Sequence, residues 1–212
     1  MHFERRGGRP VVDPSSRIAP NAVLCGDVTI GANCSVGFGA VIVAESGPVR
    51  IADNCVVMDT AVIRGVRGAP VTIGSNVLVG PRACLTGCTV EDEVFLATGA
   101  TVFNGARIGA RTVVRINGIV HLRTVLPAGS VVPMNWVAVG DPASILPPDR
   151  HDEISRLLKP LDFFGTVFGV ERPPPGETVM PALTARYAAF LRSHGEDVPL
   201  AENDPSGTGR SP

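Results

Sequence analysis

The sequence predicts an all-β fold: a parallel β-helix of hexapeptide repeats, followed by C-terminal helical segments. Two observations predict it. Aliphatic residues recur every six positions over most of the 212 residues, and the composition is 44% hydrophobic but only 5% aromatic. A period of six is neither the 3.6 of a helix nor the 2 of a long strand, and it is typical of a solenoid in which three hexapeptides make one triangular coil. The interior of such a coil has room for Val, Ile and Ala but not for rings, which accounts for the low aromatic content.

Each hexapeptide is expected to place one aliphatic residue inside the prism and a small residue near a corner. The inward positions are Ile18, Leu24, Ile30, Val36, Ile42, Ile51, Val57, Ile63, Ile73, Val79, Leu85, Val90, Leu96, Val102, Ile108, Val114, Val120, Val131 and Val137. Longer spacings predict three insertions, between residues 42 and 51, 63 and 73, and 120 and 131. All three follow the second strand of a coil, so we expect them to leave from the same corner.

The column of residues beside that corner is where we expect a functional site, because insertions in a solenoid often map to its binding face. Stacked coils lie about 4.8 Å apart, so neighbours in the column are close. The column holds the residue after each second-strand aliphatic position: Cys25, Val43, Arg64, Thr86, Phe103 and His121.

The regions outside the repeat differ from it in composition. We expect an N-terminal arm over 1–17, the β-helix over 18–145, a helical cap and tail over 146–194, and a disordered end over 195–212. Helices are expected over 149–158 and 178–193, where apolar residues recur at helical spacing. The second helix is expected to pack on the prism, with a substrate lid or docking on a neighbouring subunit as the alternatives.

Composition argues against several classes of partner. The net charge of −1 gives no electrostatic footprint for nucleic acid or for an anionic membrane. No apolar run approaches the roughly 20 residues that span a bilayer, and the N-terminus lacks the apolar core of a secretory signal. The five cysteines are odd in number and lie mostly at core-like positions, so we expect a cytoplasmic protein rather than a disulfide framework.

Three segments carry a resemblance to a known family. They read IAPNAVLCGDVTIGANCSVGFGAVIVAESGPVRIADNC, PVTIGSNVLVGPRACLTGCTVEDEVFLATGATV and VAVGDPA. They resemble the γ-class carbonic anhydrases over roughly residues 17 to 170. The resemblance implies a left-handed β-helix and a homotrimer with active sites between subunits.

The family's zinc ligands do not carry over to this sequence. In the family three histidines hold the ion, one on one subunit and two on the next. The first position corresponds to Arg64 and the other two to Pro81 and Thr86. Arginine has no lone pair to donate at accessible pH, and tight zinc binding needs three suitable ligands. We therefore predict no zinc at this position and no carbonic anhydrase activity by the zinc mechanism.

Other family positions survive in part. The family's Arg-Gly-Asp turn corresponds to Val43, Ala44 and Glu45, so an acid is kept at its end, and a later aspartate is kept as Asp59. One interpretation is that Arg64 and Arg82 supply the positive charge that the metal lost and bind an anionic or carbonyl substrate. The alternative is that Arg64 and Asp59 form an intersubunit salt bridge in an inactive site, and that Arg82 is an ordinary surface charge.

The candidate catalytic residues are Arg64, Glu45, His121 and Thr86, with Glu45 or His121 as the general base. The candidate substrate-binding residues are Arg82, Asp59 and Cys84, and no metal or other cofactor is expected. His121 lies two coils beyond Thr86 in the column, so it joins the site only if the following loop folds back.

Three functions remain open at this level, because fold alone does not choose between them. The first is a metal-free relative of the γ carbonic anhydrases, repurposed as a lyase- or transferase-type enzyme on a small carbonyl, acyl or carboxylate compound. The second is a hexapeptide acyltransferase that uses acyl-CoA, with His121 as its base. The third is a non-catalytic trimeric scaffold.

Overall fold

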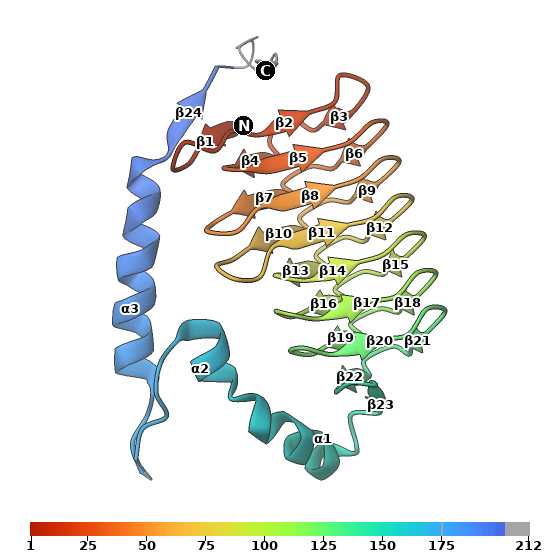
Figure 1. The fold of residues 1–212 in the computed structure, drawn as a ribbon, viewed down its shortest axis with the longest axis vertical. Helices are drawn as coiled ribbons and strands as arrows, with labels where there is room; N and C mark the ends of the chain where they lie inside the picture. The colour runs from red at the N-terminus through yellow and green to blue at the C-terminus, as the bar shows by residue number, and fades with distance from the viewer. Residues whose placement is uncertain (175, 202–212) are drawn as a thin grey trace.

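A left-handed parallel β-helix forms the body of the molecule (Figure 1). The computed structural model describes residues 1–174 and 176–201. Each coil contributes one short strand to each of three sheets, as the repeat predicted. The first sheet holds β3 (Arg17–Ile18), β6 (Ser35–Val36), β9 (Val56–Val57), β12 (Leu78–Val79), β15 (Phe95–Leu96), β18 (Val113–Val114) and β21 (Val131–Val132).

The second sheet is the longest and carries the column predicted to hold the site. In order along the prism it contains β24 (Val198–Leu200), β1 (His2–Glu4), β4 (Val23–Cys25), β7 (Val41–Ala44), β10 (Val62–Gly65), β13 (Cys84–Thr86), β16 (Thr101–Val102), β19 (Ile119–Val120), β22 (Val137–Val139) and β23 (Ser144–Leu146). Its two outermost strands, β24 and β23, run antiparallel to their neighbours and close the two ends of the sheet.

The third sheet completes the triangle. It holds β2 (Val11–Val12), β5 (Val28–Ile30), β8 (Val49–Ile51), β11 (Val71–Ile73), β14 (Thr89–Val90), β17 (Arg107–Ile108) and β20 (Val125–Leu126). Inward aliphatic side chains from all three sheets stack into one core; Ile42, Ile63 and Leu85 are fully buried. Burying one such side chain stabilises the fold by about 1.5–3 kcal/mol.

One of the three expected insertions is absent. The register continues from Val120 without a break through Leu126, Val132 and Ala138, all of which are buried. Val131, expected inside, is 46% exposed. The predicted insertion was wrong because Leu126, six residues after Val120, continues the register. The inward positions Val131 and Val137 were wrong because each is followed by a second apolar residue, Val132 or Ala138, which is the one that faces the core.

The two remaining insertions leave the corner between the second and third sheets. One follows β7, and the other follows β10 and is closed by an antiparallel bridge between Val66 and Ala69. A similar bridge between Arg5 and Gly8 closes a loop after β1. Three loops therefore stack at this corner.

Residues 1–17 do not form the arm expected from the sequence. β1 pairs with β4 and β2 pairs with β5, so this segment makes most of the first coil. The hexapeptide register in fact reaches back to Val12, six residues before Ile18. Val12 packs against the core as the later inward residues do.

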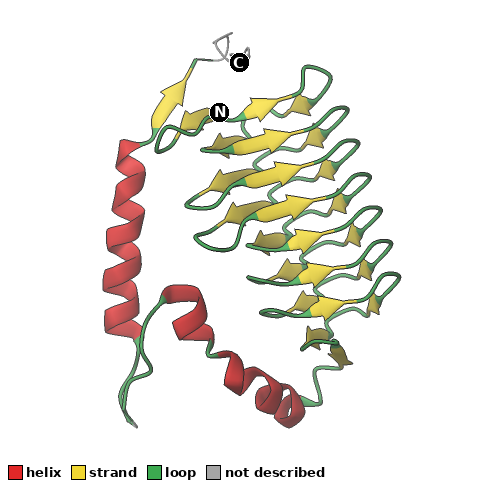
Figure 2. Ribbon diagram, in the orientation of Figure 1, coloured by secondary structure: helices red, strands yellow, loops and turns green. Residues whose placement is uncertain are grey.

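The C-terminal segment leaves the last coil and returns along the prism to the first (Figures 1 and 2). It contains α1 (His151–Leu158), η1 (Lys159–Leu161), α2 (Phe163–Phe168), α3 (Met180–Arg192) and η2 (Ser193–Glu196), and it ends in β24. β24 pairs with β1, contrary to the disorder expected from residue 195 onward. Residues 202–212 of that expected range lie outside the described residues. None of the helices described is long and apolar enough to cross a membrane.

Candidate functional site

The predicted column exists on the outer face of the second sheet. Cys25, Val43, Arg64 and Thr86 are direct partners on adjacent strands. Phe103 and His121 continue the column, each with its backbone N–H donating to the next coil at 2.9 Å. Because the residues of a solenoid column share one face, periodicity alone was sufficient to place them together.

Arg64 forms an ion pair with Glu45. The Nη1 group of Arg64 donates to Oε1 of Glu45, and it also lies 3.2 Å from the hydroxyl oxygen of Tyr187 on α3. The Glu45 side chain is 5% exposed and the Arg64 side chain is 29% exposed. Within the described part of one chain, the ion-pair partner of Arg64 is therefore Glu45, and an intersubunit pair of Arg64 with Asp59 stays a prediction.

The backbone of Glu45 is held by close packing and by a second arginine. A Cβ on Gly65 would lie 2.3 Å from the carbonyl oxygen of Gly47, so only glycine fits where the first insertion crosses β10. The Nε group of Arg5 donates to the carbonyl oxygen of Glu45 at 3.2 Å. The insertion thus presents the Glu45 carboxylate to Arg64 in a fixed position.

Thr86 and Cys84 lie next to this pair. Thr86 is the partner of Arg64 on the neighbouring strand, and Cys84 faces outward two residues earlier on the same strand; both are half-buried. Pro81 is in the turn before β13, at the other end of that strand. Within the chain, Arg64 therefore lies beside Thr86, and Pro81 lies apart from both. The resemblance had led us to expect Pro81 to be grouped with Thr86 instead.

Asp59 and Arg82 lie at a different corner from Arg64 within the chain. The backbone N–H of Arg82 donates to the carbonyl oxygen of Asp59 at 3.2 Å, and Oδ1 of Asp59 accepts from the N–H of Phe38 at 2.6 Å. Both side chains are exposed in the turns that join the first sheet to the second. These two residues are neighbours of each other, and the fold of one chain does not bring them to Glu45.

His121 belongs to a separate apolar groove. Its ring lies 5.1 Å from that of Phe103 and 5.9 Å from that of Phe163 on α2. Burial lowers the pKa of His121, and its Nδ1 atom is buried with no hydrogen-bond partner among the described residues. The groove, of about 490 Å³, is also lined by Ile154 and Leu158 of α1. No insertion follows His121, and it lies three coils, or about 14 Å, from Arg64.

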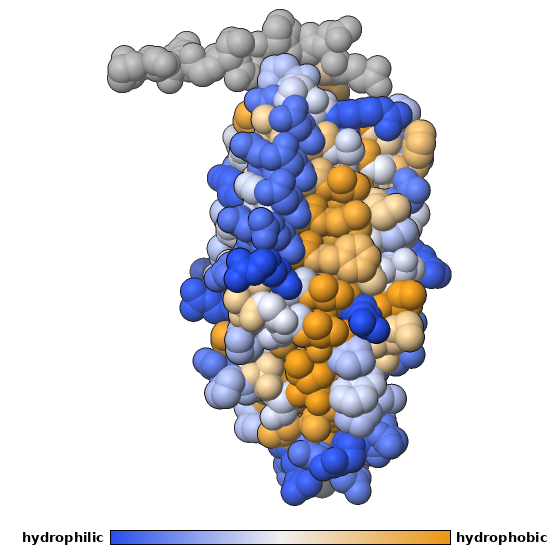
Figure 3. All heavy atoms as spheres, turned by 90° about the vertical axis from the view of Figure 1, so that its right-hand side faces the viewer, coloured by the Kyte–Doolittle hydropathy of each residue, from blue (hydrophilic) through white to orange (hydrophobic). Residues whose placement is uncertain are grey.

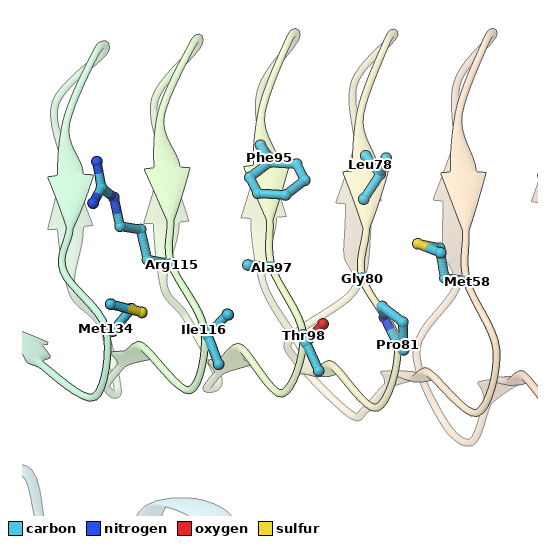
Figure 4. Close-up of a pocket in the computed structure, with 10 residues that line it drawn as sticks. All are labelled: Met58, Leu78, Gly80, Pro81, Phe95, Ala97, Thr98, Arg115, Ile116 and Met134. Atoms are coloured by element: carbon cyan, nitrogen blue, oxygen red, sulfur yellow. The ribbon is translucent and has the colours of Figure 1, made fainter.

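A second depression lies on the outer face of the first sheet. It has a volume of about 430 Å³, and Met58, Leu78, Phe95, Ile116 and Met134 are among its lining residues (Figure 4). Phe95, Ile116 and Met134 are 43–53% exposed. Figure 3 shows apolar side chains gathered in a stripe along the long axis of the molecule. Contiguous exposed apolar surface of this kind is common at protein–protein interfaces and in ligand-binding grooves.

Two residues that complete the Arg64 site, Tyr187 and Arg5, make contacts that the sequence did not predict. Tyr187 contacts Arg64 across 123 positions of sequence, and Arg5 contacts the chain at Glu45 across 40. The sequence predicts only a helix over 178–193, which contains Tyr187, and an N-terminal arm over 1–17, which contains Arg5. No local signal could have found either contact, because both depend on the path that the tail and the first coil take.

Two family models match parts of the repeat region. The family described as "Bacterial transferase hexapeptide (six repeats)" matches residues 9–44, and "Hexapeptide repeat of succinyl-transferase" matches residues 70–104. The curated protein "Gamma carbonic anhydrase 1, mitochondrial" of Arabidopsis thaliana is 32% identical over 152 residues, which cover 69% of this chain and 53% of that protein. The chain is a γ carbonic anhydrase-like hexapeptide-repeat protein.

Two further proteins are similar to this γ carbonic anhydrase-like protein: one curated relative and one solved structure. An uncharacterized protein of Dictyostelium discoideum is 33% identical over 155 residues, covering 71% of this chain and 61% of that protein. The chain thus spans between half and two thirds of the length of these curated relatives. A solved structure from Bacillus cereus, described as a candidate acetyltransferase, shares the fold with a TM-score of 0.52 at 23% identity, covering 74% of this chain and 91% of that one.

Proposed function

We propose that this γ carbonic anhydrase-like protein is a homotrimer with no metal at the family's zinc position. We further propose that it acts on a small carbonyl, acyl or carboxylate compound at a subunit interface around Arg64. The proposal rests on the hydrogen bonding of Arg64. Glu45 and Tyr187 both contact the same nitrogen, Nη1, and the remaining N–H groups of Arg64 have no partner among the described residues.

The remaining donors of Arg64 suit an oxyanion. A guanidinium has five N–H donors in a planar fork and pairs with a carboxylate through two parallel hydrogen bonds. The Arg64 side chain is 29% exposed, so a ligand can reach it, and Glu45 keeps it in one place. A fixed cation in a half-buried position can stabilise negative charge that develops on a substrate oxygen.

The donor set at the family's zinc position does not fit zinc. The corresponding residues are Arg64, Pro81 and Thr86; the first is a cation and the second has no donor atom in its side chain. One threonine hydroxyl cannot replace three nitrogen ligands. The proposed reaction therefore depends on Arg64 rather than on a metal at this position.

The proposed roles of the other residues follow from their positions. Glu45 is the proposed general base, since it contacts Arg64, while His121 lies in another groove. Thr86 and Cys84 line the site beside Arg64. Asp59 and Arg82 join it only from a neighbouring copy, and the apolar face of the first sheet supports such packing, because Met58 and Pro81 in that face are neighbours of Asp59 and Arg82 in sequence.

The proposal is tested by ligand binding and by carbon dioxide hydration. A panel of small carboxylates should contain compounds that raise the Tm of the wild type, because binding to the native state alone stabilises it. The shift should disappear in Arg64→Ala and return in part in Arg64→Lys, which keeps the charge but loses the fork. Carbon dioxide hydration should stay at the uncatalysed rate with zinc added. Zinc-dependent hydration, or carboxylate binding that Arg64→Ala leaves unchanged, would contradict the proposal.

Two other functions are distinguished by the same assay. An acyltransferase is favoured by the names of the two matching repeat families and by the neutral imidazole in the His121 groove. In that case acetyl-CoA, rather than a carboxylate, should raise the Tm, and His121→Ala should remove the shift. A scaffold without a small-molecule ligand would show neither shift. The cytoplasmic location and the lack of nucleic-acid and membrane partners remain predictions.

A further inference from the structure

A cluster of sulfur, nitrogen and oxygen donors lies outside the Arg64 site, where the C-terminal segment meets the first coils. Cys25 ends β4, and His194 and Asp197 come from η2 and the residue after it. One donor atom from each side chain, the thiol sulfur, a ring nitrogen and a carboxylate oxygen, lies within 4.8 Å of the other two. Cys25 is two strands from Arg64 in the column and is not at any of the family's zinc positions.

The distances within this cluster are close to those of a metal site. Oδ2 of Asp197 lies 3.5 Å from Sγ of Cys25 and 2.8 Å from Nδ1 of His194. Ligands of tetrahedral zinc lie about 2.0–2.3 Å from the ion, so they are about 3.3–3.6 Å from one another. An ion between the three atoms therefore requires side-chain shifts of only a few tenths of an ångström to about one ångström.

Arg5 fixes the carboxylate of this cluster. Its Nη1 group donates to Oδ1 of Asp197 at 2.7 Å, and the arginine side chain is 1% exposed. Oδ2 is thereby left facing Cys25 and His194. Carboxylates that bind metals are commonly held by such a hydrogen bond on their other oxygen. The positive charge of Arg5 also lowers the affinity for a cation, so we expect weaker binding than in sites with four cysteine ligands.

We propose that Cys25, His194 and Asp197 bind a divalent transition-metal ion, zinc by their donor set, which fastens the C-terminal segment to the first coils. Binding replaces the S–H bond of Cys25 by a metal–sulfur bond and releases the proton to solvent. Three protein ligands leave one position of a tetrahedral ion for water. Without metal, burial first and Asp197 second raise the pKa of the Cys25 thiol to about 12, so it is a poor nucleophile.

The structural consequence is a second link between the two ends of the chain. β24 already pairs with β1, and Ser193 accepts a hydrogen bond from Nη2 of Arg5 at 3.1 Å. A metal ion at Asp197 would add a bond at the junction between α3 and β24. It would therefore also steady α3, which carries Tyr187 to Arg64.

Cobalt binding to the full-length, chelator-treated protein tests the proposal, because a cobalt–thiolate bond gives a near-ultraviolet charge-transfer band. We expect one Co²⁺ per chain, the band at saturation, and its loss when Zn²⁺ is added. Cys25→Ser should abolish the band, and His194→Ala should weaken binding by roughly tenfold or more. Cys84→Ser and His151→Ala are matched controls, since both side chains are accessible and lie outside the cluster.

Independent measurements separate this site from the Arg64 site. Zn²⁺ should raise the Tm of the wild type and of Arg64→Ala equally, and should leave the Tm of Cys25→Ser unchanged. Circular dichroism checks that each variant keeps the β-helix. Absence of stoichiometric binding, or a cobalt band that Cys25→Ser retains, would overturn the proposal and leave the proposed function of Arg64 untouched.

Discussion

The ion pair between Arg64 and Glu45 changes the chemistry of this site. Glu45 is nearly inaccessible, and its charge is tolerated because Arg64 lies against it and Arg5 holds its backbone. Removing one partner of such a pair typically costs about 3–5 kcal/mol, because the other charge is left buried. The shape of the corner therefore depends in part on the two charges being present together.

His121 makes stability depend on pH. Burial lowers its pKa in the folded state, so the unfolded chain binds a proton more readily. Stability should be constant above the unfolded pKa of about 6.5 and should fall as the pH decreases from there toward the lower folded pKa. We expect a lower Tm at pH 5 than at pH 8, and a smaller difference in His121→Phe, which keeps an aromatic ring beside Phe103 and Phe163.

The measurement is a series of thermal melts between pH 5 and pH 8. His151→Phe is the control, because His151 is exposed at the start of α1 and its replacement should leave the pH dependence unchanged. A pH dependence that is identical in the wild type and in His121→Phe would contradict the role assigned to His121.

Among the elements, the C-terminal segment from α1 to β24 (residues 151–200) runs along the prism from the last coil to the first, and we call it the strap (Figure 1). α3 contacts Arg64 through Tyr187, and the segment after it is held by Arg5 and by pairing of β24 with β1 (Figure 1). β24 also covers the outer edge of β1. An uncovered edge strand offers unpaired backbone groups to other chains, so the strap protects the first coil from such pairing.

Arg5→Met should release this strap. The ion pair with Asp197 has side-chain exposures of 1% and 10%, so its loss should cost about 3–5 kcal/mol, up to the full stability of the docked strap. We expect residues 193–200 to lose protection in amide hydrogen exchange while the inner coils keep theirs. Arg9→Met, at a more exposed arginine of the first coil, is the control; equal protection in Arg5→Met and the wild type would contradict the prediction.

The apolar face of the first sheet is the surface on which the proposed trimer would assemble. Phe95, Ile116, Val131 and Met134 are each more than 40% exposed. Burying contiguous apolar surface between copies of a chain is the usual reason for such a face, and cyclic symmetry would give each copy the same contacts.

Phe95→Asp should dissociate the proposed trimer. A carboxylate at the centre of an apolar interface is desolvated without a partner, which is strongly unfavourable. Light scattering after size exclusion should give the mass of three chains for the wild type and of one chain for the variant. Val11→Asp is the control, since Val11 is as exposed but lies on the third sheet. A wild type that is monomeric at micromolar concentration would refute the assembly.

How far the fold could be predicted depends on the periodicity of each segment. Ile42, Ile63 and Leu85 were placed correctly, because each inward position is repeated in every coil. Val131 was placed wrongly, because its neighbour Val132 is also aliphatic and the pattern is ambiguous there. The arm predicted over residues 1–17 was wrong, because Val12 continues the repeat and this segment belongs to the first coil.

The candidate site was predicted in part for the same reason. The six-residue period was enough to predict the β-helix and the column that joins Arg64 to Thr86, since it fixes which residues stack in successive coils. Glu45 was expected in the same site as Arg64. The folded chain adds its direct ion pair with Arg64, the approach of Tyr187, and the convergence of Cys25, His194 and Asp197. The contacts of Tyr187, His194 and Asp197 depend on the path of a tail without any repeat. That path is held by contacts between distant segments, such as the hydrogen bond of Arg5 to Asp197 across 192 positions.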